Sequence, residues 1–272
     1  MAHEQVFERK MELGLRWEGQ SRDGKPFLSS QLLRAAAGEF IGLFLFLFNV
    51  VTIIRFISDD SFAGETSASH TMIAFGFGLS IFVLVYIMAD VSGAHLNPAV
   101  SMGLMVGKRI SVERFIIYLI AQVLGGMAGA GLATTFLSGT SGGANAVSSG
   151  VDVADAFGGE VVCTFLLVTT VFAACDGELG RKNAHTGPLL PFVIGMAVLL
   201  DHLILIPVDG CSINPARSFA TAFTNNQWDD HWVFWIGPML GGVLATVVWE
   251  AVLRPDQPVE DQEKHIVQAA TV

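Results

Sequence analysis

Two copies of the tripeptide Asn-Pro-Ala, each set among apolar residues, constrain the fold of this chain more than any other feature. They are Asn97-Pro98-Ala99 and Asn214-Pro215-Ala216. Asparagine is a favoured N-cap and proline suits the first helical position, so each triplet predicts the start of a helix. The apolar stretches that follow, 98–106 and 215–223, cover only about half of a bilayer core. We therefore expect two short helices that begin inside a membrane.

The composition is that of an integral membrane protein. Of 272 residues, 52% are hydrophobic and only 15% are charged, and the mean hydropathy is +0.55. A typical soluble domain has about 25% charged residues. Six further stretches are long and apolar enough to cross a bilayer. They are residues 32–54, 71–89, 115–137, 157–175, 190–208 and 231–253.

The two halves of the chain look like a duplication. Ala37-Gly38-Glu39 recurs as Gly158-Gly159-Glu160, and Leu124-Gly125-Gly126 recurs as Leu240-Gly241-Gly242, in the same order and at nearly the same offset as the two triplets. Each repeat holds three spans, an odd number, so the second must be inverted relative to the first. Inversion brings the two short helices in from opposite faces, with their N-termini meeting near the membrane midplane, where we expect a conduit.

The repeats also define the predicted domain organisation. We expect a cytoplasmic N-terminal tail at 1–30, a channel domain at 31–254 and a cytoplasmic C-terminal tail at 255–272. Within the channel domain, repeat 1 covers about 31–138 and repeat 2 about 154–254. The tail at 1–30 lacks the pattern of a signal peptide.

Basic residues gather on one side of the predicted spans, which places both termini in the cytoplasm. The net charge of −10 lies mostly in tails and loops and indicates ordinary solvation, and no basic patch indicates a nucleic-acid partner. The three cysteines, Cys163, Cys175 and Cys211, imply neither a disulfide framework nor a zinc site.

Residues 92–100 and 210–219, Ser-Gly-Ala-His-Leu-Asn-Pro-Ala-Val and Gly-Cys-Ser-Ile-Asn-Pro-Ala-Arg-Ser-Phe, resemble the signature segments of aquaporins, in the major intrinsic protein family. The resemblance covers about 32–253. It implies an all-α membrane protein with six transmembrane helices and two re-entrant half-helices, arranged as inverted repeats around a central pore. It also implies water as the permeant and a homotetramer in the lipid bilayer. Because the residues show no Ser/His/Asp constellation, phosphate loop or metal set, we expect no enzyme activity, cofactor or metal.

The resemblance assigns roles to pore residues. Asn97 and Asn214 would turn their side-chain amides into the pore, although they could also serve only as helix caps. The four filter positions fall on Phe77, His202, Cys211 and Arg217, a set similar to the water-selective branch. The alternatives to a filter role are that Phe77 is an aromatic ring facing the core and that His202 is a histidine packed between helices. A purely structural role is less plausible for Arg217, because an unpaired charge at membrane depth is costly unless it faces a water-filled cavity.

Other residues are assigned to the scaffold. Glu39 and Glu160 would accept hydrogen bonds from the re-entrant loops, which we favour over a proton-relay role. Glycines of the third and sixth spans would let helices approach closely. These are Gly125, Gly126, Gly129, Gly131, Gly237, Gly241 and Gly242.

Regulation is a further hypothesis. The segment 176–191 resembles the gating loop of plant plasma-membrane aquaporins, in which a histidine senses acidification and a leucine plugs the pore. Here these residues are His185 and Leu189; the alternative for His185 is a solvated loop histidine. Ser111 resembles a phosphorylation site, with a helix N-cap as its alternative.

We therefore expect a passive, bidirectional, proton-excluding water channel driven by osmotic gradients in the plasma membrane, with gating by cytoplasmic pH or phosphorylation. The alternative is a facilitator of glycerol or another small neutral solute. A structural or adhesion role, or an enzyme, has less support. Asp201 and Asp90 depart from the family pattern: Asp201 either reaches the filter, where it would pair with Arg217 or charge His202, or faces another helix.

Overall fold

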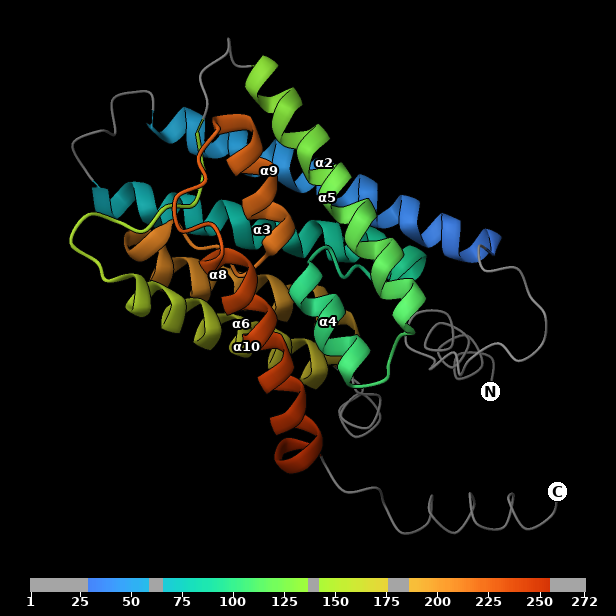
Figure 1. Cartoon of the computed structure of the whole chain (residues 1–272). Coiled ribbons are helices and arrows are strands. Elements are labelled where there is room, and N and C mark those ends of the chain that lie inside the picture. The colour runs from blue at the N-terminus through green and yellow to red at the C-terminus, as the bar shows by residue number, and fades with distance from the viewer. Residues whose placement is uncertain (1–28, 59–65, 137–141, 176–185, 255–272) are drawn as a thin grey trace, which may run out of the picture.

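The computed structural model describes residues 29–58, 66–136, 142–175 and 186–254 as a bundle of helices with no strand in these ranges (Figure 1). Six of its helices are long and apolar enough to cross a membrane. They confirm the six predicted spans, and most extend a few residues beyond them. In chain order the elements are α2 (Ser30–Ser58), α3 (Thr66–Ser92), α4 (Pro98–Val106), α5 (Val112–Phe136), α6 (Val153–Cys175), α8 (Thr186–Asp209), α9 (Pro215–Asn225), α10 (Val233–Val248) and the π-helical turn η1 (Trp249–Leu253).

The outer surface of the bundle is apolar. Large hydrophobic side chains are widely exposed on the spanning helices, among them Tyr86 at 76%, Val162 at 66% and Phe136 at 65%. Such a surface is compatible with lipid and not with water. The chain is a multi-pass integral membrane protein.

The helices pack as two intertwined halves. Helix α2 lies along α5 and α6 lies along α10, while α3 against α8 joins the halves. The half-helix α4 contacts α10 and α5, and α9 contacts α5 and α10. Each half-helix is therefore held by helices of both repeats, and Figure 1 shows α9 and α4 in the middle of the bundle. This exchange of partners is what two inverted repeats produce.

Glycines set the closest helix approaches in both halves. A Cβ atom at Gly125 of α5 would lie 2.2 Å from the carbonyl oxygen of Phe40 on α2, and one at Gly241 of α10 would lie 2.4 Å from that of Val161 on α6. Any side chain at these positions would force the helices apart. Gly131 differs from the prediction, since a Cβ atom there would have nothing within 4 Å.

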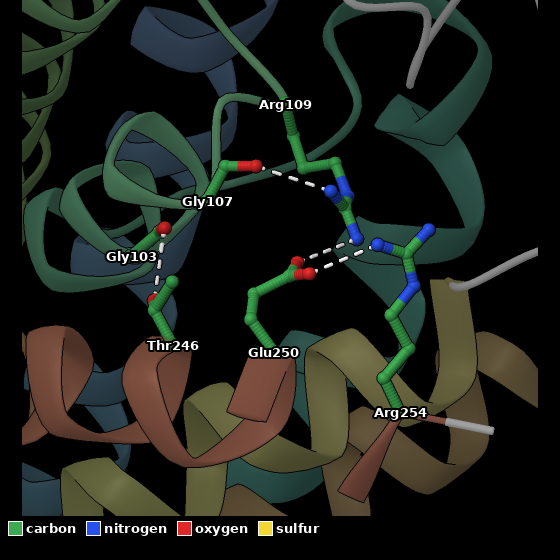
Figure 2. Close-up of polar contacts among 6 residues, drawn as sticks. All are labelled: Gly103, Gly107, Arg109, Thr246, Glu250 and Arg254. Atoms are coloured by element: carbon green, nitrogen blue, oxygen red, sulfur yellow. Dashed lines mark hydrogen bonds and ion pairs between the residues drawn. The ribbon is translucent and has the colours of Figure 1, made fainter. Parts of the chain in front are cut away.

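The far end of α4 is tied to the last helix (Figure 2). Thr246 of α10 donates its hydroxyl to the carbonyl of Gly103 at 2.9 Å. Arg109, just after α4, donates to the carbonyl of Gly107 at 3.1 Å and forms an ion pair with Glu250 of η1 at 2.9 Å. These contacts hold the half-helix from its outer end.

Candidate functional site

The two loops that precede the half-helices repeat one irregular backbone. Within 93–97 and 210–214, corresponding residues take positive φ angles. L-residues with a side chain adopt this region at a cost of about 1–2 kcal/mol each. The matched residues are Gly93 and Gly210, Ala94 and Cys211, and Leu96 and Ile213. Two loops with the same strain need the same kind of support.

Glu39 of α2 supports the first loop. Its Oε1 atom accepts hydrogen bonds from the hydroxyl of Ser92 at 2.6 Å and the backbone N–H of His95 at 2.9 Å. Its Oε2 atom accepts from the N–H of Leu96 at 2.7 Å and the amide of Gln122 at 2.8 Å. A buried carboxylate with four donors fits the scaffold role.

Glu160 of α6 supports the second loop in the same way. Its two oxygens accept the backbone N–H groups of Ser212 at 2.6 Å and Ile213 at 2.7 Å. Glu39 and Glu160 are both fully buried. Irregular backbone is tolerated at membrane depth only when its polar groups are satisfied inside the protein, and these two carboxylates do that.

The asparagines of the two triplets bind each other's loops. Asn97 caps α4, since its Oδ1 atom accepts the N–H of Ala99 at 2.8 Å, and its Nδ2 atom donates to the carbonyl of Ile213 at 2.7 Å. Asn214 caps α9 and donates to the carbonyl of Leu96 at 2.8 Å. An amide nitrogen carries two hydrogens, so each Nδ2 keeps one donor beyond this bond.

Both asparagines line an inner cavity that runs past the junction of the half-helices. Its room for water is only about 50 Å³. The lining extends from Phe77 and His202 at one end to Cys175 and Leu190 at the other. A lining this long around so little volume makes a narrow conduit. Its walls are mostly apolar, with Asn97, Asn214, His95, Ser212 and His202 among its polar members.

Phe77 and His202 close one end of this cavity. Their ring centroids lie 3.9 Å apart, so the rings touch, and the guanidinium carbon of Arg217 lies 5.4 Å from the centre of the Phe77 ring. The Nδ1 atom of His202 lies 2.8 Å from the carbonyl of Val198. That contact assigns the proton to Nδ1, which leaves Nε2 as an acceptor.

Arg217 faces an outer cavity of about 360 Å³ on the other side of this constriction. Its guanidinium donates to the side-chain oxygen of Asn145 and, at 3.5 Å, to the carbonyl of Gly210. The structure thus brings three of the four predicted filter residues together. Cys211 is fully buried and lines neither cavity, and its backbone N–H donates to Asp209 at 2.9 Å.

Comparison with known proteins shows which family has this architecture. The family model described as major intrinsic protein matches residues 27–249. The chain belongs to the major intrinsic protein family. Aquaporin PIP1-1 of Oryza sativa subsp. japonica is 42% identical over 228 residues, covering 81% of this chain and 78% of that relative. An aquaporin of PIP type from Atriplex canescens is 43% identical over 229 residues, covering 81% and 80%.

A solved structure confirms the fold of this major intrinsic protein. The aquaglyceroporin from Plasmodium falciparum superposes with a TM-score of 0.74, covering 82% of this chain and 98% of that one. Its sequence identity of 22% supports the fold alone. The predicted arrangement of six spans and two half-helices in inverted repeats is therefore confirmed.

Asn145 is a residue of this major intrinsic protein that the sequence did not reveal. It lies in the segment between α5 and α6, where its Oδ1 atom accepts from Arg217 and, at 2.7 Å, from the hydroxyl of Ser218. Its Nδ2 atom donates to the carbonyl of Asp209 at 3.1 Å. Asn145 thereby fixes the arginine from a distant part of the chain, and no local pattern marks it.

His95 was likewise overlooked, although it stands two residues before Asn97. Its Nδ1 atom lies 2.9 Å from the hydroxyl of Ser101, its ring packs edge-on against Tyr118 at 4.9 Å between centroids, and it lines the inner cavity. Its place two residues before the capping asparagine was the available signal.

Asp201 faces another helix and not the filter. It is fully buried and lies beside the thiol of Cys163 on α6. Within the described residues its carboxylate makes no hydrogen bond to Arg217 or His202. The pairing considered for Asp201 is therefore absent here. Asp90 is exposed near the end of α3, outside the lining of the inner cavity.

The residues of the gating hypothesis are only partly visible. His185 lies outside the described residues. Leu189 is 51% exposed at the start of α8, and it is its neighbour Leu190 that lines the inner cavity. Ser111 accepts the backbone N–H of Arg114 at 3.2 Å, so it caps α5.

Proposed function

We propose that this protein is a passive, bidirectional water channel that excludes protons and is driven by osmotic gradients. The observation that carries the proposal is the narrow inner cavity, with polar groups at the asparagine junction and the filter. Such a conduit admits a single file of small neutral molecules. The names of the relatives as aquaporins support water as the permeant.

Proton exclusion follows from the junction of the half-helices. Helices α4 and α9 both begin there, so the positive ends of their dipoles converge on the cavity. The remaining amide hydrogens of Asn97 and Asn214 are donors, so a water at the junction accepts two hydrogen bonds and turns its own hydrogens away. That orientation interrupts a proton relay, and the positive potential repels cations.

Selection at the filter rests on size and charge. The bulky Phe77 and His202 rings touch and narrow the constriction, while Arg217 presents a fixed cation on the outer side. A glycerol molecule needs a wider opening than water does. We therefore propose water selectivity over the glycerol-facilitator alternative.

Shrinkage of proteoliposomes in stopped flow tests this function. We expect the protein to raise water permeability well above that of empty liposomes without admitting glycerol, and His202→Gly to admit glycerol. Leu203→Ala, a lipid-facing change on the same helix, is the matched control. Equal passage of water and glycerol through the wild type would favour a solute facilitator, and water permeability no higher than that of empty liposomes would favour a structural role.

The proposal also covers the orientation of the channel, its membrane and its oligomeric state. Basic residues on one side of the spans support cytoplasmic termini, and the plant relatives support a plasma-membrane location. A homotetramer, the absence of enzyme activity, and gating through His185, Leu189 and Ser111 follow from the family resemblance. Flux at cytoplasmic pH 6 and pH 7.5, with and without His185→Ala, tests the pH sensor.

A further inference from the structure

A charged pocket of about 450 Å³ lies where α4 ends against the last helix, away from the conduit. Figure 2 shows its two arginines directed at the same glutamate. The lining residues are Val106, Gly107, Lys108, Arg109, Glu250 and Arg254. Among the described residues, three cations and one carboxylate line this pocket.

Glu250 organises the two guanidinium groups. Its oxygens lie 2.9 Å from Arg109 and 2.9 Å from Arg254, so two like charges are held side by side. Arg109 is further fixed by the carbonyl of Gly107 at 3.1 Å and by the ring of Phe172, 5.6 Å from its guanidinium carbon. Adjacent guanidinium groups with a fixed geometry suit the oxygens of a phosphate group.

Lys108 is the third cation, and its backbone has a positive φ angle. Its φ angle is +57°, the left-handed conformation that commonly follows a helix end and that favours glycine. A lysine here is conformationally disfavoured relative to glycine. A Lys108→Gly substitution would therefore remove the positive charge and at the same time suit the left-handed backbone conformation at this position.

Exposed aliphatic side chains lie on the elements that form the charged pocket or directly beside them. Val106 on its rim is 39% exposed, Val252 is 73% exposed and Leu253 is 46% exposed. At the start of α5, Val112 is 59% exposed. Cations beside exposed aliphatic groups at the ends of spanning helices match the boundary between the headgroup layer and the hydrocarbon of a bilayer.

We propose that this pocket binds the phosphate group of an anionic phospholipid, with its acyl chains along the exposed aliphatic side chains. Lys108, Arg109 and Arg254 neutralise the headgroup, and Val106 on the rim contacts the chains. Free phosphate shares the headgroup chemistry but has nothing to place on the aliphatic surface. The bound lipid would join the end of α4 to η1 and reinforce the tie made by Glu250.

Native mass spectrometry of the full chain in detergent tests the site. Dioleoyl phosphatidic acid, dioleoyl phosphatidylcholine and inorganic phosphate are titrated separately. We expect phosphatidic acid to bind in preference to phosphatidylcholine, and Lys108→Gly and Arg254→Gln each to weaken that binding about fivefold, the effect of one cation near a membrane surface. Arg34→Gln, which removes the same charge from an exposed position on α2, is the control and should leave the affinity unchanged.

Three results would overturn the proposal. Lys108→Gly and Arg254→Gln could bind phosphatidic acid as the wild type does, which would show lipid spread over the whole surface. Arg34→Gln could weaken binding as much as the pocket variants, which would show an effect of net charge alone. Inorganic phosphate could displace the lipid completely at equal concentration, which would make free phosphate the ligand. Because Lys108→Gly suits its backbone, lost binding in that variant is not a folding defect.

Discussion

Asn97 donates its side-chain amide to the carbonyl of Ile213, 2.7 Å away and 116 positions later in the chain. The bond crosses between the two repeats, and Asn214 returns it to Leu96. Each capping residue of one half thus completes the loop of the other. The junction of the half-helices is a shared structure that neither repeat forms alone.

Asn97→Asp tests the electrostatics of this junction. The carboxylate retains the oxygen that caps α4, but it replaces the donor to Ile213 with a negative oxygen facing a carbonyl. We expect lower stability and, in the molecules that fold, measurable leakage of cations and protons. Vesicles containing a pH-sensitive dye measure that leak, and an unchanged proton barrier would contradict the electrostatic account of exclusion.

Glu39→Gln and Glu160→Gln should differ in severity. In either orientation, the glutamine amide nitrogen at position 39 would face a backbone N–H and a side-chain donor that must turn to accept, whereas at position 160 it would face a backbone N–H alone. An unsatisfied buried donor costs about 1–3 kcal/mol. We expect Glu39→Gln to lower the thermal unfolding temperature in detergent more than Glu160→Gln does, and the reverse order would disprove this assignment of contacts.

Gly125→Ala should separate α5 from α2. The added methyl carbon would lie 2.2 Å from the carbonyl oxygen of Phe40, and backbone there cannot move aside locally. We expect a loss of folded protein, since overpacking typically costs about 1–3 kcal/mol and more where backbone is the obstacle. Gly131→Ala on the same helix meets nothing within 4 Å and should leave yield unchanged or raised. Size-exclusion profiles of both variants measure the outcome.

Asn145→Ala should release Arg217 from its position. A hydrogen bond to a charged group contributes about 1.5–3 kcal/mol, and the buried guanidinium would lose its Asn145 partner. We expect reduced thermal stability together with altered water permeability in proteoliposomes. Ser149→Ala, an exposed change in the same segment, serves as the control. Wild-type flux and stability in Asn145→Ala would show that the arginine is held by other contacts.

His231 should confer a pH dependence on stability. The indole N–H of Trp235 donates to Nε2 of His231 at 3.1 Å, which requires that nitrogen to be unprotonated, and partial burial lowers the pKa of His231 below 6.5. The unfolded chain therefore binds more protons, so stability is present above pH 6.5 and declines as pH falls. We expect His231→Gln, whose oxygen can accept the same bond, to show a weaker decline between pH 7 and pH 5. Tryptophan fluorescence during thermal unfolding measures both.

Local rules explain why the core of the fold was predictable from the sequence. Capping and the proline preference act within a few residues, so Asn97 and Asn214 could be assigned as helix starts directly. The span lengths followed from hydropathy, and inversion followed from an odd number of spans. Helix ends were less predictable, and the π-helical turn at Trp249–Leu253 has no local signature.

The candidate site was harder, because its contacts join distant segments. Asn145 reaches Arg217 across 72 positions, and nothing near either residue announces that contact. The direction of the Asp201 side chain could have been predicted from the sequence. Adjacent helical residues point about 100° apart, so Asp201 cannot face the filter if His202 does. Resemblance placed Cys211 at the filter, while its side chain is buried outside both cavities.

The crossed bonds between the two loops also affect biosynthesis. The carbonyl of Leu96 gains its partner only when Asn214, 118 residues later, has left the ribosome. At about 5–20 residues per second, that interval is roughly 6–24 seconds. During that interval the carbonyl of Leu96 lacks this partner. An unsatisfied peptide group is costly inside a bilayer, so the first half gains its full stability only when the second half has been made.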